Sequence, residues 1–308
     1  MRFWLCCLIL VNLNWISVLR AAEFSVGESA EGILISEAGE KVLFFQRLPK
    51  SLDGRYTRAN YVHPFYDLAG EVLTEDFPAD HRHHRGIFWA WHQLWLGDKK
   101  LGDAWTTKDF LAEVKAVDVD RKEPNRCTIK TKVEWTCPDP DDKNRTLSVV
   151  EEQAKITVHA REASRRLVDF EIRLRALNPD VKLGGSEDQK GYGGFSTRIK
   201  LPEGIQFRDS EGPVEAKTTA VKAGPWLDFS TEKTGLAILD HPANPGYPQA
   251  WILRKQRSMQ NPAYPGRDPV KLSQETPMVL RYRLVVHDGS LDRKTLDKLQ
   301  SEWAAGEN

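Results

Sequence analysis

Alternation of apolar and polar residues is the main structural signal in this chain. In the stretch 166–177 every second residue is apolar and the residues between them are mostly charged, the apolar set being Val168, Phe170, Ile172, Leu174 and Ala176. Because successive side chains of a strand point to opposite faces, this pattern predicts a strand with one face in the core and one in water. Similar runs occupy residues 114–120, 127–135 and 148–160.

Shorter β patterns flank this central region. They occupy residues 33–35, 41–46 and 59–63 before it, and residues 196–201, 204–208, 234–239, 251–253 and 278–287 after it. The stretch 290–303 alone has helical spacing of apolar residues, with Ser290 as its predicted N-cap. These patterns predict an all-β protein: one large antiparallel β-sandwich domain over residues 23–308, similar to a supersandwich, with a C-terminal α-helix.

The first 22 residues have the pattern of a secretory signal peptide. Arg2 is followed by an apolar run at 3–11, and the small residues Ala21 and Ala22 offer a cleavage site. The apolar run is shorter than the roughly 20 residues that a membrane span needs. We therefore expect an exported protein, periplasmic or extracellular, with no membrane segment after cleavage.

Charge excludes one class of partner. Lys plus Arg and Asp plus Glu are both 44, so the formal net charge is +0. A chain without a basic excess has no global field that attracts nucleic acid or anionic lipid. The expected partner is a small molecule or an oligosaccharide, and the oligomeric state is left open.

The stretch 74–92 concentrates candidate chemistry, because it holds four of the eight histidines: His81, His83, His84 and His92. On an extended chain His81 and His83 would share a face with Arg85, while His84 would point the opposite way. His81 and His83 are therefore candidate ligands of a divalent metal, with a third ligand from His63, His92 or a carboxylate. No cofactor is certain from the sequence, and the metal remains one alternative.

A glycine-rich segment supplies candidate carboxylates. Five glycines fall within residues 184–195, around Glu187 and Asp188, so the backbone there is able to approach a ligand closely. General acid-base catalysis needs two groups with different pKa values, which an imidazole and a carboxylate provide. We predict His83 or His84 as the acid, and Glu187 or Asp188 as the base.

Aromatic residues suggest the ligand. Trp89, Trp91, Trp95 and Trp105 cluster near the histidines, and aromatic faces beside charged groups suit the stacking of sugar rings. We predict a sugar cleft between the histidine stretch and the glycine-rich segment. Its expected substrate contacts are His63, Asp76, His81, Arg85, Trp89, His92, Gln189 and Tyr192.

Several motifs together resemble a known family. They are YVHP at 61–64, GEVLT at 70–74, DFP at 76–78, HRHHRG at 81–86 and WAWH at 89–92. They resemble a secreted bacterial family that is labelled "PmoA family" or "methane oxygenase PmoA". The resemblance implies a secreted protein that accompanies polysaccharide use and, more loosely, a galactose-mutarotase-like supersandwich.

Three functions follow from these observations. The first is an exported carbohydrate-active enzyme, a hydrolase, lyase or epimerase that uses histidine and carboxylate as acid and base. The second is a carbohydrate-binding protein without catalysis, in which the histidines would be paired off structurally. The third is a metal-dependent oxygenase, in which at least three of five histidines would converge on one point: His63, His81, His83, His84 and His92.

Overall fold

Two large antiparallel sheets form the body of the protein. The computed structural model describes residues 23–142, 144–200, 203–256 and 259–306, so the predicted signal peptide lies outside the described residues. The six-stranded sheet has the order β1-β2-β3-β6-β7-β15. Its bounds are β1 Phe24–Glu28, β2 Gly32–Glu37, β3 Glu40–Gln46, β6 Tyr61–Phe65, β7 Ile87–Trp91 and β15 Gly193–Thr197.

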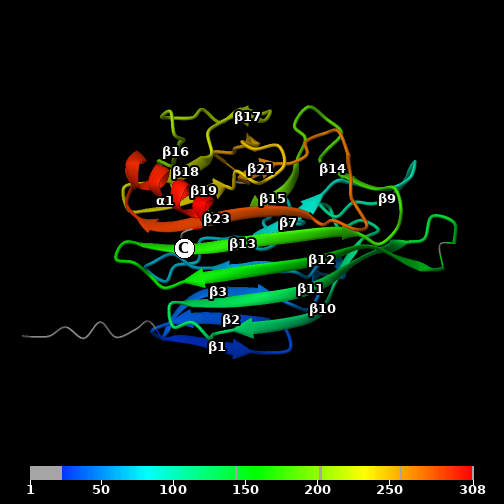
Figure 1. Ribbon diagram of the computed structural model, residues 1–308, viewed down its shortest axis with the longest axis horizontal. Coiled ribbons are helices and arrows are strands. Elements are labelled where there is room, and N and C mark those ends of the chain that lie inside the picture. Colours follow the sequence, from blue (N-terminus) through cyan, green and yellow to red (C-terminus); the bar gives the residue numbers. More distant parts are fainter. Residues whose placement is uncertain (1–22, 143, 201–202, 257–258, 307–308) are drawn as a thin grey trace, which may run out of the picture.

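The second sheet has eight strands in the order β10-β11-β12-β13-β23-β19-β18-β16. Its strands are β10 Leu111–Asp120, β11 Arg126–Pro138, β12 Thr146–His159, β13 Arg165–Ala176, β16 Gln206–Arg208, β18 Trp226–Ser230, β19 Thr234–Asp240 and β23 Met278–Asp288. The four longest of these, β11, β12, β13 and β23, run side by side across the middle of Figure 1. The prediction of an all-β sandwich is confirmed.

Smaller sheets lie around this body. One has the order β22-β14-β8-β9 and another the order β17-β20-β21, and β4 pairs with β5. Their bounds are β4 Lys50–Leu52, β5 Arg55–Arg58, β8 Gln93–Leu96, β9 Lys99–Gly102, β14 Val181–Gly184, β17 Val221–Lys222, β20 Ala250–Ile252, β21 Asn261–Ala263 and β22 Val270–Lys271.

The alternation in β13 explains how the two large sheets pack. Val168, Phe170 and Ile172 are at most 1% exposed, as the pattern predicted. The Phe170 ring meets Trp89 of β7 at 6.3 Å and Phe195 of β15 at 5.1 Å between ring centroids. The core therefore lies between the two sheets, where aromatic rings contribute much of the buried area.

The helix α1, Arg293–Ala305, begins later than the sequence suggested. Its N-cap is Asp292 rather than Ser290, because the Asp292 side chain accepts a hydrogen bond from the Thr295 backbone nitrogen at 2.8 Å. Leu296 and Leu299 are buried in a small cluster with residues of β18, β19 and β23. Within the described ranges no helix combines the length and the apolar character that crossing a bilayer requires.

Candidate functional site

The histidine segment, residues 78–84, forms two tight turns, which corrects the expectation of an extended chain there. The His81 nitrogen donates to the Pro78 carbonyl at 3.1 Å, and the His84 nitrogen donates to the His81 carbonyl at 2.9 Å. The three imidazoles consequently cluster. His81 and His84 stack at 4.8 Å with an interplanar angle of 3°, and His83 meets the His84 ring edge to face at 4.6 Å.

This cluster lines a cavity of about 380 Å³. The structure brings five of the predicted site residues to it, namely His81, His83, His84, His92 and Tyr192. The sequence did not single out most of the remaining lining, which consists of Trp105, Thr106, Lys190, Arg254, Gln256 and Met259. The functional roles of the five predicted residues stay predictions.

Stacked aromatic rings form one wall of this histidine cavity. Trp105 stacks on His92 at 5.3 Å and on Tyr192 at 5.8 Å, with interplanar angles of 25° and 30°. The buried Arg58 fixes this wall, because its guanidinium donates to the carbonyl oxygens of Ala104 and Trp105, both at 2.8 Å. A rigid aromatic wall of this kind suits the flat, apolar face of a ring-shaped ligand.

Asp103 holds His92 in a defined orientation. The His92 Nδ1 lies 2.9 Å from the Asp103 carboxylate, and both side chains are 22% exposed. Burial alone would raise the pKa of Asp103, but hydrogen bonds from His92 and Thr106 outweigh it and lower that pKa. Because an ionised carboxylate only accepts hydrogen bonds, the hydrogen between the two groups is on the His92 Nδ1, and Nε2 is the acceptor in the neutral tautomer.

The β8–β9 hairpin brings this pair together. Leu94 lies opposite Gly102 in the hairpin, so the residues just outside it, His92 and Asp103, become neighbours. The residues Gly97 and Asp98 of the connecting turn are a signal that could have revealed the pair from sequence. Pairing the chain about such a turn places residue 92 opposite residue 103.

His84 is a neutral hydrogen-bond donor. It is 5% exposed, and burial lowers its pKa to about 2, with smaller contributions from His83 and His81. Arg198 donates to the His84 Nδ1 at 3.3 Å, and Arg198 is itself held by Glu75 at 2.8 Å. The proton of the neutral ring is therefore on Nε2.

His83 is also neutral at physiological pH. Burial lowers its pKa to about 4, with further contributions from the charges of Arg58 and His81. Within the described part of the chain the His83 imidazole makes no hydrogen bond, so both ring nitrogens are available to a ligand. His81 differs, because its Nδ1 lies 2.7 Å from Asp80 and its side chain is 45% exposed.

The carboxylates of the glycine-rich segment do not line the cavity. Glu187 is 62% exposed and forms an ion pair with Lys100 at 2.8 Å. Asp188 accepts hydrogen bonds from Ser186 and from the Lys190 backbone nitrogen, and Gln189 is exposed. The tip of this segment therefore faces solvent, and only its later part, from Lys190 to Tyr192, reaches the cavity.

Three other predicted residues anchor the histidine segment instead of lining the cavity. The fully buried Arg85 forms an ion pair with Asp76 at 2.8 Å, and its other amino group donates to two backbone carbonyls at 2.7 Å. His63 lies 2.9 Å from the Thr74 hydroxyl, and burial lowers its pKa to about 4. Gly86, directly after Arg85, lets the backbone pass close to β6, since a Cβ at Gly86 would lie 2.0 Å from the Val62 carbonyl oxygen.

Trp89 belongs to the core and not to the cavity lining. It is 4% exposed, and its indole nitrogen donates to Glu152 at 2.8 Å. Glu152 also accepts hydrogen bonds from Trp135 and Asn60, and burial raises its pKa to about 7. The aromatic side chains that line the histidine cavity are instead those of Trp105 and Tyr192, and Tyr192 was among the predicted substrate contacts.

The predicted metal ligands do not form a metal cage. No group of three or more His, Cys, Asp or Glu side chains is arranged to hold an ion among the residues that the structure describes. The His81 Nδ1 is engaged by Asp80 and the His84 Nδ1 by Arg198. A metal site built on His81 and His83 stays a prediction.

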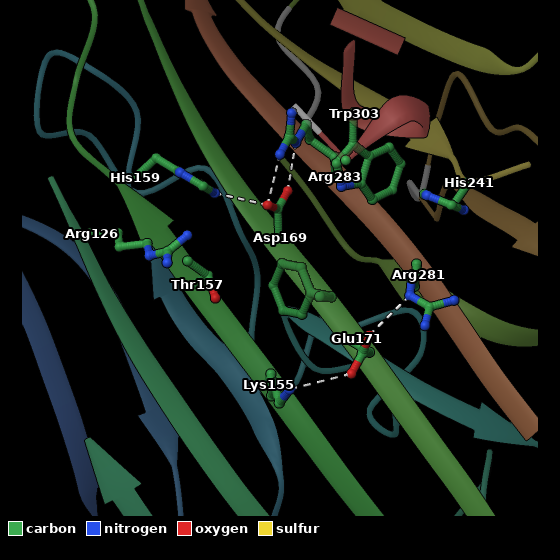
Figure 2. A pocket seen from close by; sticks show the side chains of 12 residues that line it. Arg126, Lys155, Thr157, His159, Asp169, Glu171, His241, Arg281, Arg283 and Trp303 are labelled. Atoms are coloured by element: carbon green, nitrogen blue, oxygen red, sulfur yellow. Dashed lines mark hydrogen bonds and ion pairs between the residues drawn. The ribbon is translucent and has the colours of Figure 1, made fainter. Parts of the chain in front are cut away.

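A second cavity, of about 290 Å³, lies on the outer face of the eight-stranded sheet, the face that points away from the core (Figure 2). In this outer groove Asp169 of β13 binds Arg283 of β23 at 2.6 Å and His159 of β12 at 2.8 Å. Glu171, two residues further along β13, binds Arg281 at 2.9 Å. Figure 2 shows these carboxylates between the cationic side chains of the two neighbouring strands.

Comparisons with known proteins identify the family. A solved structure from Salmonella typhimurium, named "putative mutarotase (YeaD)", matches with 11% identity and covers 86% of this chain and 94% of its own. Its TM-score of 0.35 is too low to support an argument about this chain. No curated protein matches the chain, and neither reported match supports the PmoA designation. The family model described as "Family of unknown function (DUF6807)" matches residues 33–301, so the chain belongs to that family.

Proposed function

We propose that this chain is a carbohydrate-active enzyme that moves protons on a sugar bound in the histidine cavity. The observation that carries the proposal is the hydrogen bond between His92 and Asp103 beside the stacked rings of Trp105 and Tyr192. It combines a surface that suits a sugar ring with an oriented imidazole that suits proton transfer.

His92 is the proposed proton acceptor and donor. Its Nε2 would take a proton from the substrate, and the Asp103 carboxylate would stabilise the imidazolium that results, as in other histidine and aspartate pairs. His84 would donate a hydrogen bond from Nε2 to the substrate oxygen that gains negative charge. A neutral imidazole is suited to this task because it polarises an oxygen without an added charge.

The charge of the lining favours an epimerase or a lyase over a hydrolase. Most glycoside hydrolases use a pair of carboxylates that flank the bond to be cleaved. The described residues that line the cavity include no Asp or Glu. In the epimerase version His92 would remove the proton of the anomeric hydroxyl while the ring C–O bond opens. It would then return that proton to the ring oxygen, which gives the open-chain aldehyde. After rotation about the C1–C2 bond, the same hydroxyl would add to the other face of the aldehyde with the proton transfers reversed, which re-forms the ring as the other anomer.

A panel of sugars tests the proposal. Anomer interconversion would be followed by NMR and the formation of unsaturated products by ultraviolet absorbance, for the wild type and the variants His92→Gln and Asp103→Asn. His159→Gln is the matched control, because His159 also pairs with an aspartate but lies in the outer groove. Full activity of His92→Gln would contradict the proposal. Binding without turnover in every arm would instead favour the carbohydrate-binding alternative.

Export is part of the same proposal. Its support is the sequence pattern of residues 1–22, with Arg2 before an apolar run and small residues at 21 and 22. The mass of the protein recovered from a bacterial periplasm tests it. A mature chain that starts near residue 22 or 23 supports export, and an uncleaved chain in the cytoplasm contradicts it.

A further inference from the structure

A further hollow of about 400 Å³ adjoins the histidine cavity. The two share four lining residues, which are Lys190, Tyr192, Arg254 and Gln256. The shared wall is ordered, because Arg254 donates to the Tyr192 hydroxyl at 2.6 Å. A ligand longer than one ring could therefore lie across this wall with one end in each space.

The adjoining hollow is lined by cations. Its charged lining residues are Lys190, Lys217, Arg254 and Lys255, and none of its described lining residues is Asp or Glu. One of these positive charges is partly balanced, because the Asp188 carboxylate lies 3.6 Å from the Lys190 ammonium group. In a chain whose formal net charge is +0, this is a local excess of positive charge, which raises the local concentration of anions.

Arg254 is fixed in position without an ion pair to any carboxylate among the described residues. Besides Tyr192, it donates to the backbone carbonyls of Lys217 at 2.7 Å, Leu253 at 2.8 Å and Thr218 at 3.0 Å. All of these acceptors are neutral. Arg283 in the outer groove differs, because its partner is the carboxylate of Asp169. The hydrogen bonds of Arg254 occupy the N–H groups of both terminal nitrogens, so Arg254 would attract an anionic group of a ligand mainly through its charge.

We propose that the adjoining hollow is a subsite for an anionic sugar unit. The substrate would then be an acidic saccharide, with a carboxylate or sulfate group near Arg254 and the lysines, and with the neighbouring unit in the histidine cavity. The similar volumes of the two spaces, about 380 and 400 Å³, suit one unit in each. This inference rests on the proposed function and narrows its substrate class.

Calorimetric titration of the mature chain tests this inference. The probes are a tetrasaccharide of galacturonate, a sulfated carrageenan tetrasaccharide and neutral maltotetraose, each at low and high salt. The acidic probes should bind about tenfold tighter than the neutral one at low salt, as expected for two partly exposed charge pairs. The difference should shrink at high salt because salt screens exposed charges.

Paired variants locate the effect. Lys217→Gln with Lys255→Gln should remove most of the preference for acidic probes. Lys99→Gln with Lys271→Gln is the matched control, because both lysines are exposed and lie outside the two cavities. A preference for carboxylate or for sulfate supports the subsite and identifies its ligand chemistry. A preference that survives in the first double variant overturns it, as does tighter binding of single-stranded DNA than of either acidic sugar.

Different results would overturn the anionic subsite and the proposed function. Equal, salt-independent binding of neutral and acidic probes overturns the anionic subsite, while turnover that depends on His92 would still support the proposed function. His92→Gln should lower turnover strongly and keep the preference for acidic probes, because His92 does not line the adjoining hollow. Loss of that preference in His92→Gln would contradict the assignment of the anion to the hollow.

Discussion

The histidine cavity and the outer groove contain similar residues in different arrangements. Both are lined by histidine, arginine and tryptophan side chains, and in each a lining histidine pairs with an aspartate, although Asp103, the partner of His92, is not itself a lining residue. In the outer groove Asp169 is shared between Arg283 and His159, so its charge is matched within the protein. In the histidine cavity, by contrast, the His83 imidazole makes no hydrogen bond to a described residue. Residue types alone therefore do not distinguish a site of chemistry from a set of structural ion pairs.

Strand register explains the difference. Asp169 lies directly opposite Arg283, and Glu171 lies opposite Arg281, in the pairing of β13 with β23. Opposite charges at facing positions stabilise a sheet, so these residues are satisfied as soon as the strands align. The histidines lie on turns and beside a hairpin, where no ladder supplies partners. Such loops on a rigid scaffold are where binding residues concentrate.

The largest expected effect separates the two regions by activity. His92→Gln should lower turnover by about 100-fold to 10,000-fold, the usual contribution of a general acid or base. His159→Gln should leave turnover unchanged. Steady-state kinetics with the best substrate of the panel measures both. Equal losses in the two variants would contradict the distinction between the cavity and the groove.

For the free energy of unfolding, we expect the larger effect in the outer groove and the smaller one in the histidine cavity. Arg283→Met leaves Asp169 without its main partner, and removing one member of a buried ion pair costs about 3 kcal/mol of unfolding free energy. Asp103→Asn keeps a hydrogen-bonding side chain beside His92 and should cost less than about 1.5 kcal/mol. Urea unfolding measures both values. A larger loss in Asp103→Asn than in Arg283→Met would be inconsistent with this account.

The pH dependence of stability tests the neutral state of His84. Its folded pKa, about 2, lies below the unfolded value of 6.5, so the unfolded chain binds the proton first as the pH falls. Stability is therefore retained above pH 6.5 and is lost below it, by about 1.4 kcal/mol per pH unit for one such group. In His84→Gln the decline between pH 6 and pH 4 should be shallower by about this amount. Parallel curves for both proteins would show that His84 is not buried in its neutral form.

The smallest effect is expected at Glu187. Its ion pair with Lys100 is exposed, and such pairs contribute at most about 1 kcal/mol. Glu187→Gln should therefore leave turnover nearly unchanged and lower the unfolding free energy by no more than this amount. A loss of turnover comparable with that of His92→Gln would return Glu187 to the catalytic role that the sequence suggested.

The fold was predictable because its signal is periodic. The alternation around Phe170 specifies both the strand and the face that it buries, and the structure follows it closely. The helix start was missed by a few residues because Ser290 and Asp292 are both good N-caps by type. Only the hydrogen bond to Thr295 distinguishes them.

The candidate site was predictable only in part. The density of histidines between residues 81 and 92 marked a segment that lines a cavity, but its turns depend on backbone hydrogen bonds that alternation does not encode. Arg254 reaches the cavity from more distant sequence, and no local pattern announces it. Trp89 and Trp105 have the same residue type, yet one packs in the core and the other forms a cavity wall. Long-range packing decides such cases.

Nitrogen NMR of histidine-labelled protein observes the proposed catalytic imidazole itself. We expect His92 to be protonated on Nδ1 and its Nε2 resonance to move when the tightest-binding saccharide of the panel is added. The resonances of His159, which is paired in the outer groove, should stay in place. A saccharide that moves the His159 resonances and leaves those of His92 unchanged would contradict the account.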